Sequence, residues 1–198
     1  MLRTCLTLWA LCGAAVVLAE DGSAIKFPSP DKRFALRVTE LKESEFAELK
    51  VELIEKASGK VLVDLTTAYG KHLSDTVLVW SADSKWAAFA TRDEREGATN
   101  VYFWNGSAVE EVPLPVDLPG PDIKFRPKDQ DGGVKAYGGE VKPLRWLKSG
   151  SLELSSDSMM MSRESGDTYL GVLVITISFD AKRHASVQKV GKTKTTVE

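Results

Sequence analysis

Apolar and polar residues alternate with a period of two along most of this chain, as they do in strands that place one face in a core. Phe34, Leu36 and Val38 point to one side, and the same alternation runs through residues 49–53 and 61–65. Residues 57–60, between the last two runs, include a glycine that suits a turn position of positive φ. The pattern predicts strands here, with a hairpin joining the second and third.

Further hairpins follow along the chain. Apolar residues 77–80 and 86–90 bracket the polar turn 81–85. Residues 101–104 and 107–109 flank Asn105-Gly106, the dipeptide that best tolerates a two-residue type I′ turn with positive φ at both positions. More strands are predicted at 144–146, 151–154, 172–177 and 185–190.

Prolines and paired glycines interrupt residues 113–143, so we expect a long connection with one short strand at 123–125. A helical alternative exists only at 41–56, as a short turn near 44–48, and the alternation at 49–53 favours a strand. The tail from Gly191 is expected to fray. The predicted fold class is all-β, with antiparallel sheets arranged as incomplete propeller-like blades or as packed sheets.

Charge indicates where two of these strands lie in their sheets. Residues 172–177 carry no charge on either face, which predicts a buried central strand. Residues 49–55 are rich in Lys and Glu, which favours an edge strand.

The first 19 residues read as a secretory signal peptide. Arg3 precedes the uncharged apolar run 5–19, which ends in Ala19 just before Glu20. Because this run is shorter than the roughly 20 residues of a transmembrane helix, we expect cleavage more than a retained anchor. Both cysteines lie in the leader, so residues 20–190 are expected to form a single domain without disulfides, secreted or periplasmic.

The charge balance argues against one class of partner. The formal net charge of −2 becomes −3 once Arg3 leaves with the leader. A nucleic-acid partner is not expected, because phosphate binding requires a basic patch. After the leader, no apolar run free of charge is long enough to span a membrane.

A polar turn recurs ahead of apolar strands. It occurs as Ser29-Pro30-Asp31-Lys32 and as Ser81-Ala82-Asp83-Ser84-Lys85, and more weakly around Ser149-Gly150. These residues resemble the turn of TolB-like and WD40-like β-propeller blades, where Ser-Pro-Asp-Gly-Lys precedes the innermost strand. The resemblance implies about three degenerate blade units.

The spacing of these turns does not suit a closed ring. Asp31 and Asp83 are 52 positions apart, and Ser149 follows 66 positions after Asp83, against roughly 40 to 45 per regular blade. Closed propellers have about 4 to 8 blades. We therefore expect units that do not close a ring within one chain, as an incomplete propeller, a pair of packed sheets or a ring completed by a dimer.

Candidate chemistry is sparse. The two histidines, His72 and His184, form no ligand pair at metal spacing, and no nucleophile elbow is present. Residues 129–133 resemble part of a calcium loop but lack its closing Glu. Methionines 159–161 suit copper(I), yet neighbours on a strand point to opposite faces. We predict no catalytic, cofactor-binding or metal-ligating residues and leave the ligand-binding residues open.

Trp80, Trp86, Trp104 and Trp146 are expected to fill the core more than to stack on a ligand. The function predicted from the sequence is a secreted or periplasmic, non-catalytic binding or scaffolding domain. Its partner is expected to be another protein or a second copy, bound through a sheet edge. The alternative is a small extracytoplasmic hydrolase or carbohydrate-processing enzyme, with a metal-handling protein third.

Export is testable directly. Because Ala19 closes the small-residue cleavage pattern, the exported protein is expected to begin near Glu20. N-terminal sequencing of exported material checks this, and a start at Met1 or beyond about Lys26 would contradict it.

Overall fold

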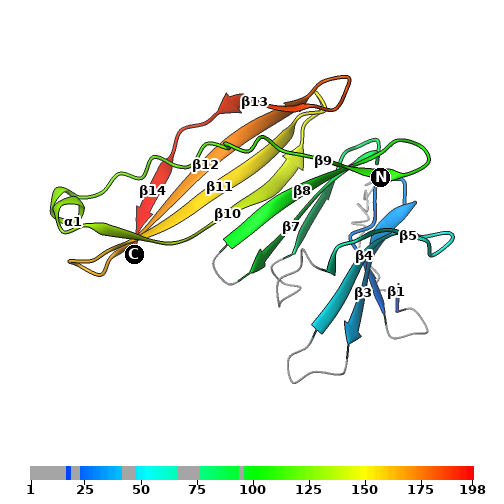
Figure 1. Cartoon of the computed structure of the whole chain (residues 1–198), viewed down its shortest axis with the longest axis horizontal. Helices are drawn as coiled ribbons and strands as arrows, with labels where there is room; N and C mark the ends of the chain where they lie inside the picture. Colours follow the sequence, from blue (N-terminus) through cyan, green and yellow to red (C-terminus); the bar gives the residue numbers. More distant parts are fainter. Residues whose placement is uncertain (1–16, 19–22, 42–47, 67–75, 94–95) are drawn as a thin grey trace, which may run out of the picture.

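The structure is a computed structural model that describes residues 17–18, 23–41, 48–66, 76–93 and 96–198. Nearly all regular elements in these ranges are strands, so the all-β prediction is confirmed (Figure 1). The single α-helix among them is α1 (Pro127–Asp131). The strands are β1 (Val17–Leu18), β2 (Ala24–Lys26), β3 (Phe34–Leu41), β4 (Glu48–Glu55), β5 (Val61–Asp64), β6 (Val77–Trp80), β7 (Trp86–Asp93), β8 (Glu96–Trp104), β9 (Val109–Val112), β10 (Val134–Trp146), β11 (Leu152–Ser162), β12 (Thr168–Phe179), β13 (Ala185–Val190) and β14 (Lys194–Val197).

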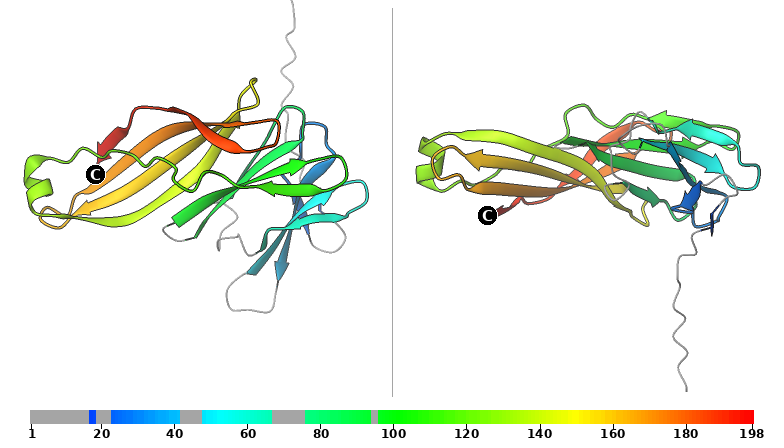
Figure 2. Two further views of the ribbon diagram at one scale, coloured as in Figure 1. Left: turned by 45° about the horizontal axis from the view of Figure 1, so that its top comes forward. Right: turned by 90° about the horizontal axis from the view of Figure 1, so that it is seen from below.

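The strands form three antiparallel meanders, β2 to β5, β6 to β9 and β10 to β13. The first meander, with β1 on β2, is a separate five-stranded sheet. The other two join where β8 pairs in parallel with Gly139 and Glu140 of β10. β14 pairs with β12 beside β13. The joined sheet curls, and its longest strands extend away from the first sheet (Figure 2).

The second meander is covered on both faces, which divides the hydrophobic core into two layers. On one face, Phe89 belongs to a buried cluster with Leu36 of the first sheet. On the other face, Ala88 belongs to a cluster with Leu154 and Ile175 of the third meander. Each large side chain buried in this way stabilises the fold by about 1.5–3 kcal/mol.

Two tryptophans tie successive meanders together. The indole N–H of Trp80 donates to the carbonyl oxygen of Phe27 at 2.9 Å. The indole N–H of Trp146 donates to the carbonyl oxygen of Val79 at 3.2 Å. Each tryptophan is the last residue of the first strand of its meander, so the same device occurs twice.

The first polar turn is built from its own side chains. The Ser29 hydroxyl donates to Asp31 at 2.7 Å and accepts from the Phe34 amide at 3.0 Å. Lys32 adopts a left-handed φ of 62°. Burial raises the pKa of Asp31, but hydrogen bonds from Ser29 and Arg33 outweigh it and lower the pKa to about 2.

The second turn repeats this geometry. The Ser81 hydroxyl donates to Asp83 at 2.6 Å and accepts from the Trp86 amide at 2.9 Å, and Ser84 has a φ of 60°. The two turns also meet, because the buried Ser84 hydroxyl accepts from the Asp31 amide at 3.0 Å. The sequence pattern therefore identified two turns of equivalent geometry. The structure places these turns in contact.

The turn between β10 and β11 is one residue shorter than the turn between β6 and β7. Seven positions separate Trp80 from its strand partner Ala87, whereas six separate Trp146 from Leu152. A change of one residue exchanges the faces of a strand. The third meander consequently turns Leu152 towards the second meander, on the same side as Trp146. Among the described residues the meanders form two packed sheets and no ring, and the propeller resemblance stays a prediction.

The hairpin at Asn105-Gly106 is present, but its predicted turn type is wrong. Trp104 pairs with Val109, which leaves a four-residue loop. Positive φ occurs at Gly106 alone, at 106°. The Asn105 side-chain oxygen accepts the amides of Ser107 and Ala108, both at 2.9 Å, and this local capping favours the wider loop.

The predicted long connection ends sooner than expected, because β10 already begins at Val134. Pro143 is tolerated in this strand because it lies beside a register shift, where β10 no longer pairs with β8. Residues 123–125 form no strand, although their burial alternates as in one. The amides of Asp122 and Lys124 bond to threonine hydroxyls of the C-terminal segment in place of a ladder.

Of the two predicted strand positions, one is confirmed and the other is wrong. Residues 172–177 lie centrally, between β11 and the β13–β14 edge, as predicted. The predicted edge strand 49–55 is wrong, because β4 pairs with both β3 and β5. Its buried Glu52 is tolerated there because Arg37 and Lys50 form ion pairs with it at 2.8 and 2.7 Å.

The ends of the chain also differ from expectation. Residues 194–197 were expected to fray, but they form β14, whose Thr195 pairs with Gly171. Most of the predicted leader lies outside the described residues, as does nearly all of the possible helical turn at 44–48. Signal cleavage and export therefore remain predictions. No helix among the described residues is long and apolar enough to cross a membrane.

Gly171 is expected to be required for the packing of β12. A side chain at this position would meet Ile123 at 2.5 Å and Pro121 at 3.0 Å. Gly171→Val should destabilise the protein by about 1–3 kcal/mol through overpacking, measured by urea denaturation. Gly120→Ala is the matched control, because no atom lies within 4 Å of its added carbon. Equal midpoints for the two variants would contradict this packing.

Candidate functional site

The distal parts of β10, β11 and β12, together with β14, project beyond the second meander as an arm (Figure 1). Its two faces differ because residues alternate across each strand. Tyr169, Gly171 and Leu173 of β12 point to one face and are buried. Leu170 and Val172 point to the other face and are partly exposed. The candidate site follows from this difference.

Residues 113–126, here called the strap, cover the buried face. The strap crosses the arm between β9 and α1 (Figure 1). Ile123 lies against Gly171, and Phe125 packs edge-on against Tyr169 with ring centroids 4.9 Å apart. The first strap residues continue the core of the body, where Leu114 packs against the second buried cluster. The strap therefore acts as the missing layer on this side of the sheet.

A buried carboxylate fixes the end of the strap. Asp129 in α1 is fully buried and accepts hydrogen bonds from the Tyr169 hydroxyl, from Arg126 Nε at 2.8 Å and from Ser162 Oγ at 3.1 Å. Arg126 also forms an ion pair with Asp167. Because every partner of this carboxylate is a donor, the cluster holds it ionised.

The hydrogen bonds have an electrostatic consequence. The Tyr169 hydroxyl, followed by Ser165, lowers the pKa of Asp129 well below its usual range, against the opposing effect of burial. Asp129 is the first residue of the segment 129–133, which resembles part of a calcium loop. Asp129 joins helix to sheet, whereas Asp131 is exposed.

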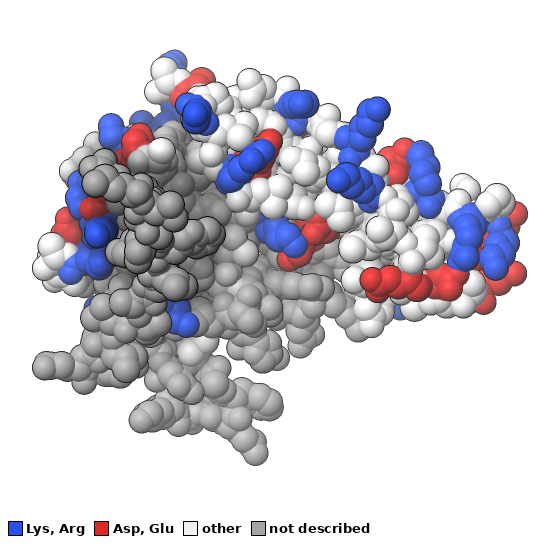
Figure 3. All heavy atoms as spheres, turned by 180° about the vertical axis from the view of Figure 1, so that it is seen from behind, with Lys and Arg blue, Asp and Glu red and all other residues white. Residues whose placement is uncertain are grey.

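The other side of the arm carries the candidate site, which we call the open face. Five apolar side chains at least partly exposed to solvent lie on it: Met159, Met161, Leu170, Val172 and Val174. The first four are partly exposed, and 38% of Val174 is exposed. Seen from behind the molecule, uncoloured surface runs along the arm between charged groups (Figure 3). These side chains form an apolar surface that is interrupted on β11 by Ser155 and Asp157, which pair with Val174 and Val172.

Ion pairs border this surface on the β10 side. Lys142 contacts Glu140 at 2.6 Å and Asp157 at 3.2 Å. Arg145 contacts Glu153 at 2.7 Å. Each carboxylate on β10 and β11 therefore has a cation beside it.

The structure does not assemble the candidate residues of the sequence into one site. His184 is exposed at the β12–β13 turn, 3.0 Å from Asp180, and His72 lies outside the described residues. Methionines 159–161 alternate between faces, with Met160 on the strap side opposite Tyr169. Among the described residues, no group of three or more His, Cys, Asp or Glu side chains is placed to hold a metal ion.

The tryptophans contact other aromatic side chains. Trp86 packs against Phe103 and Phe179 with centroids 4.6 and 4.7 Å apart, and Trp146 lies 5.6 Å from it. Trp104 and Trp80 both pack on Phe34, with ring centroids 5.3 and 5.9 Å from it. These contacts agree with the prediction that the four tryptophans fill the core.

A small hollow remains between Trp80 and Trp104. Its volume is about 10 Å³, close to the space that one water molecule requires. Burial, with a smaller contribution from Glu111, raises the pKa of its Tyr102 to about 12. The hollow as it stands is too small for a sugar ring, so it does not support the carbohydrate alternative.

Sequence reasoning did not identify the open face. Its signal was present in the uncharged run 172–177, which was interpreted as buried on both sides. Exposure of Val174 shows that one side remains open. No family model matches the chain, and no curated protein matches it.

The buried carboxylate predicts an acid-dependent stability. A folded-state pKa below the ordinary value of 3.8 contributes stability that is present above that value and is lost as the pH falls further. Asp129→Asn should therefore lower the denaturation midpoint at pH 7, and the difference from the unmodified protein should narrow below about pH 4. Asp131→Asn, on the exposed side of α1, is the control and should change little at either pH. A difference independent of pH would contradict the role of the Asp129 charge.

Proposed function

We propose that this chain is a non-catalytic binding or scaffolding domain acting outside the cytoplasm, and that it binds a protein through the open face of the arm. The supporting observation is the asymmetry of one sheet, whose strap side is covered by residues 113–126 while apolar side chains on the other side are at least partly exposed. Val174 is 38% exposed at the centre of the most apolar strand. Apolar side chains gathered on one exposed face mark binding surfaces more often than single scattered ones do.

The geometry favours the face of the arm over its edges. β10 has a register shift between Ala136 and Gly138, and such irregularities disfavour the pairing of a further strand. The edge formed by β13 and β14 carries lysines, which have the same effect. Face-to-face contact requires no free backbone groups, so neither feature opposes it.

Site-specific photocrosslinking tests this function. A photoreactive residue replaces Val174 in the full-length chain expressed in its own host, and adducts are analysed by mass spectrometry. We expect a discrete protein adduct from this position. The same residue at Val116, which is 98% exposed on the strap, should not give that adduct.

A substitution within the face supplies the second control. Leu170→Asp adds a charge at a partly exposed site on the same face of β12 as position 174 and should abolish the adduct while the circular dichroism spectrum is retained. No adduct from position 174, or the same adduct from position 116, would refute binding through this face.

A further inference from the structure

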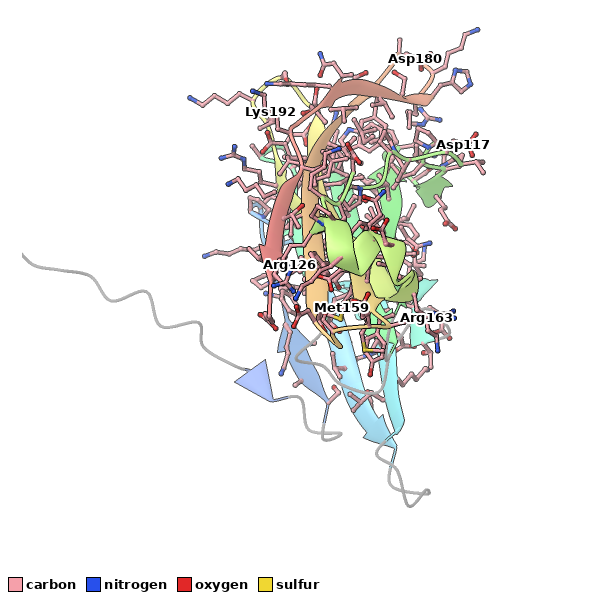
Figure 4. All side chains as sticks on the ribbon, turned by 90° about the vertical axis from the view of Figure 1, so that its left-hand side faces the viewer. Asp117, Arg126, Met159, Arg163, Asp180 and Lys192 are labelled. Atoms are coloured by element: carbon pink, nitrogen blue, oxygen red, sulfur yellow. The ribbon has the colours of Figure 1, made fainter. Side chains whose placement is uncertain are left out.

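The border of the open face along β13 and β14 carries three lysines within six residues: Lys189, Lys192 and Lys194. Strand register places Lys189 opposite Thr176 and Lys194 opposite Val172, on the side of the open face. Viewed from the tip of the arm, Lys192 lies on the side away from Asp117 of the strap (Figure 4). These three lysines, here called the lysine border, thus lie along the β13–β14 side of the open face.

The lysine border is electrostatically unlike the border on the β10 side. None of its lysines forms an ion pair with a described residue, whereas Lys142 of β10 has two carboxylates beside it. Glu198, just beyond β14, is the nearest carboxylate along this edge in sequence. The border is therefore positive in a chain whose formal net charge is −2.

We propose that the protein bound by the open face is acidic, with carboxylates that meet the lysine border while its apolar residues cover Val172 and Val174. This inference rests on the proposed function and adds the chemistry of the partner. Complementary charge around an apolar centre raises the association rate and excludes partners of the same sign. Lysines that form no ion pair within the described part of the chain are suited to this purpose.

A protein fits this surface better than an anionic membrane does. Interfacial membrane binding relies on large apolar side chains, such as Trp, Phe and Leu, that insert among lipids. The apolar side chains of the open face are partly buried between neighbouring strands. They form a surface suited to packing against another surface.

Charge reversal tests the inference. The triple variant Lys189→Glu, Lys192→Glu and Lys194→Glu is combined with the photoreactive residue at position 174. We expect the adduct yield to fall at least about fivefold at low salt, and raising the ionic strength to about 0.5 M should weaken the adduct of the unmodified border. The control Lys56→Glu, Lys60→Glu and Lys148→Glu makes the same change of charge at exposed turn positions and should leave the yield unchanged.

The outcomes separate the two proposals. An adduct that persists unchanged in the border variant refutes the acidic partner but leaves binding through the open face intact. Absence of any adduct with the border unmodified refutes the proposed function itself. Sedimentation of the purified protein with phosphatidylglycerol vesicles, lost in the border variant, would overturn a protein partner in favour of an anionic membrane. Denaturation midpoints of both triple variants equal to that of the unmodified protein confirm that folding is unaffected.

Discussion

A sheet that extends beyond the layer on which it packs exposes apolar side chains on both faces, and the strap removes this exposure on one side of the arm. The contact is close, since a carbon atom added at Gly171 would lie 2.5 Å from Ile123. Other features depend on this contact. The Asp129 cluster fixes the far end of the strap, and hydroxyls of Thr193 and Thr195 hold its backbone beside β14. Together they replace a second sheet with a single extended segment.

The same constraint explains why the two sides of the arm differ. On the strap side, Tyr169 is fully buried and bonded to Asp129. On the open side, Leu170 and Val172 come from the same strand and remain partly exposed. A single chain thus builds one closed and one open surface from one alternating pattern. Ion pairs such as Arg145–Glu153 place charged groups on the open side.

Turn length determines how the third meander packs. The first two polar turns share side-chain capping and a left-handed residue, and they lie in contact. The turn after Trp146 is shorter by one residue, which exchanges the faces of β11. Leu152 and Leu154 consequently pack against the second meander.

Local chemistry allowed much of the fold to be predicted from the sequence. Alternation identified β3 and the hairpins, because strand periodicity depends only on neighbouring residues. The absence of charge in residues 172–177 identified the central position of β12. Charge was a poorer guide, as Glu52 shows: its central position depends on Arg37 from an adjacent strand. The turn at Asn105 was misjudged because its side chain caps amides two and three residues further on.

By itself, the sequence determined the fold class, most strand positions and the first two polar turns, because each depends on contacts within a few residues. Only the tertiary structure decided which face of β12 would be covered. The strap contacts Gly171 through a residue about fifty positions away in the sequence. No local pattern at 168–177 can therefore predict this contact. The candidate site belongs to this second class, since the exposure of Val174 is what remains after the distant segment has covered the opposite face.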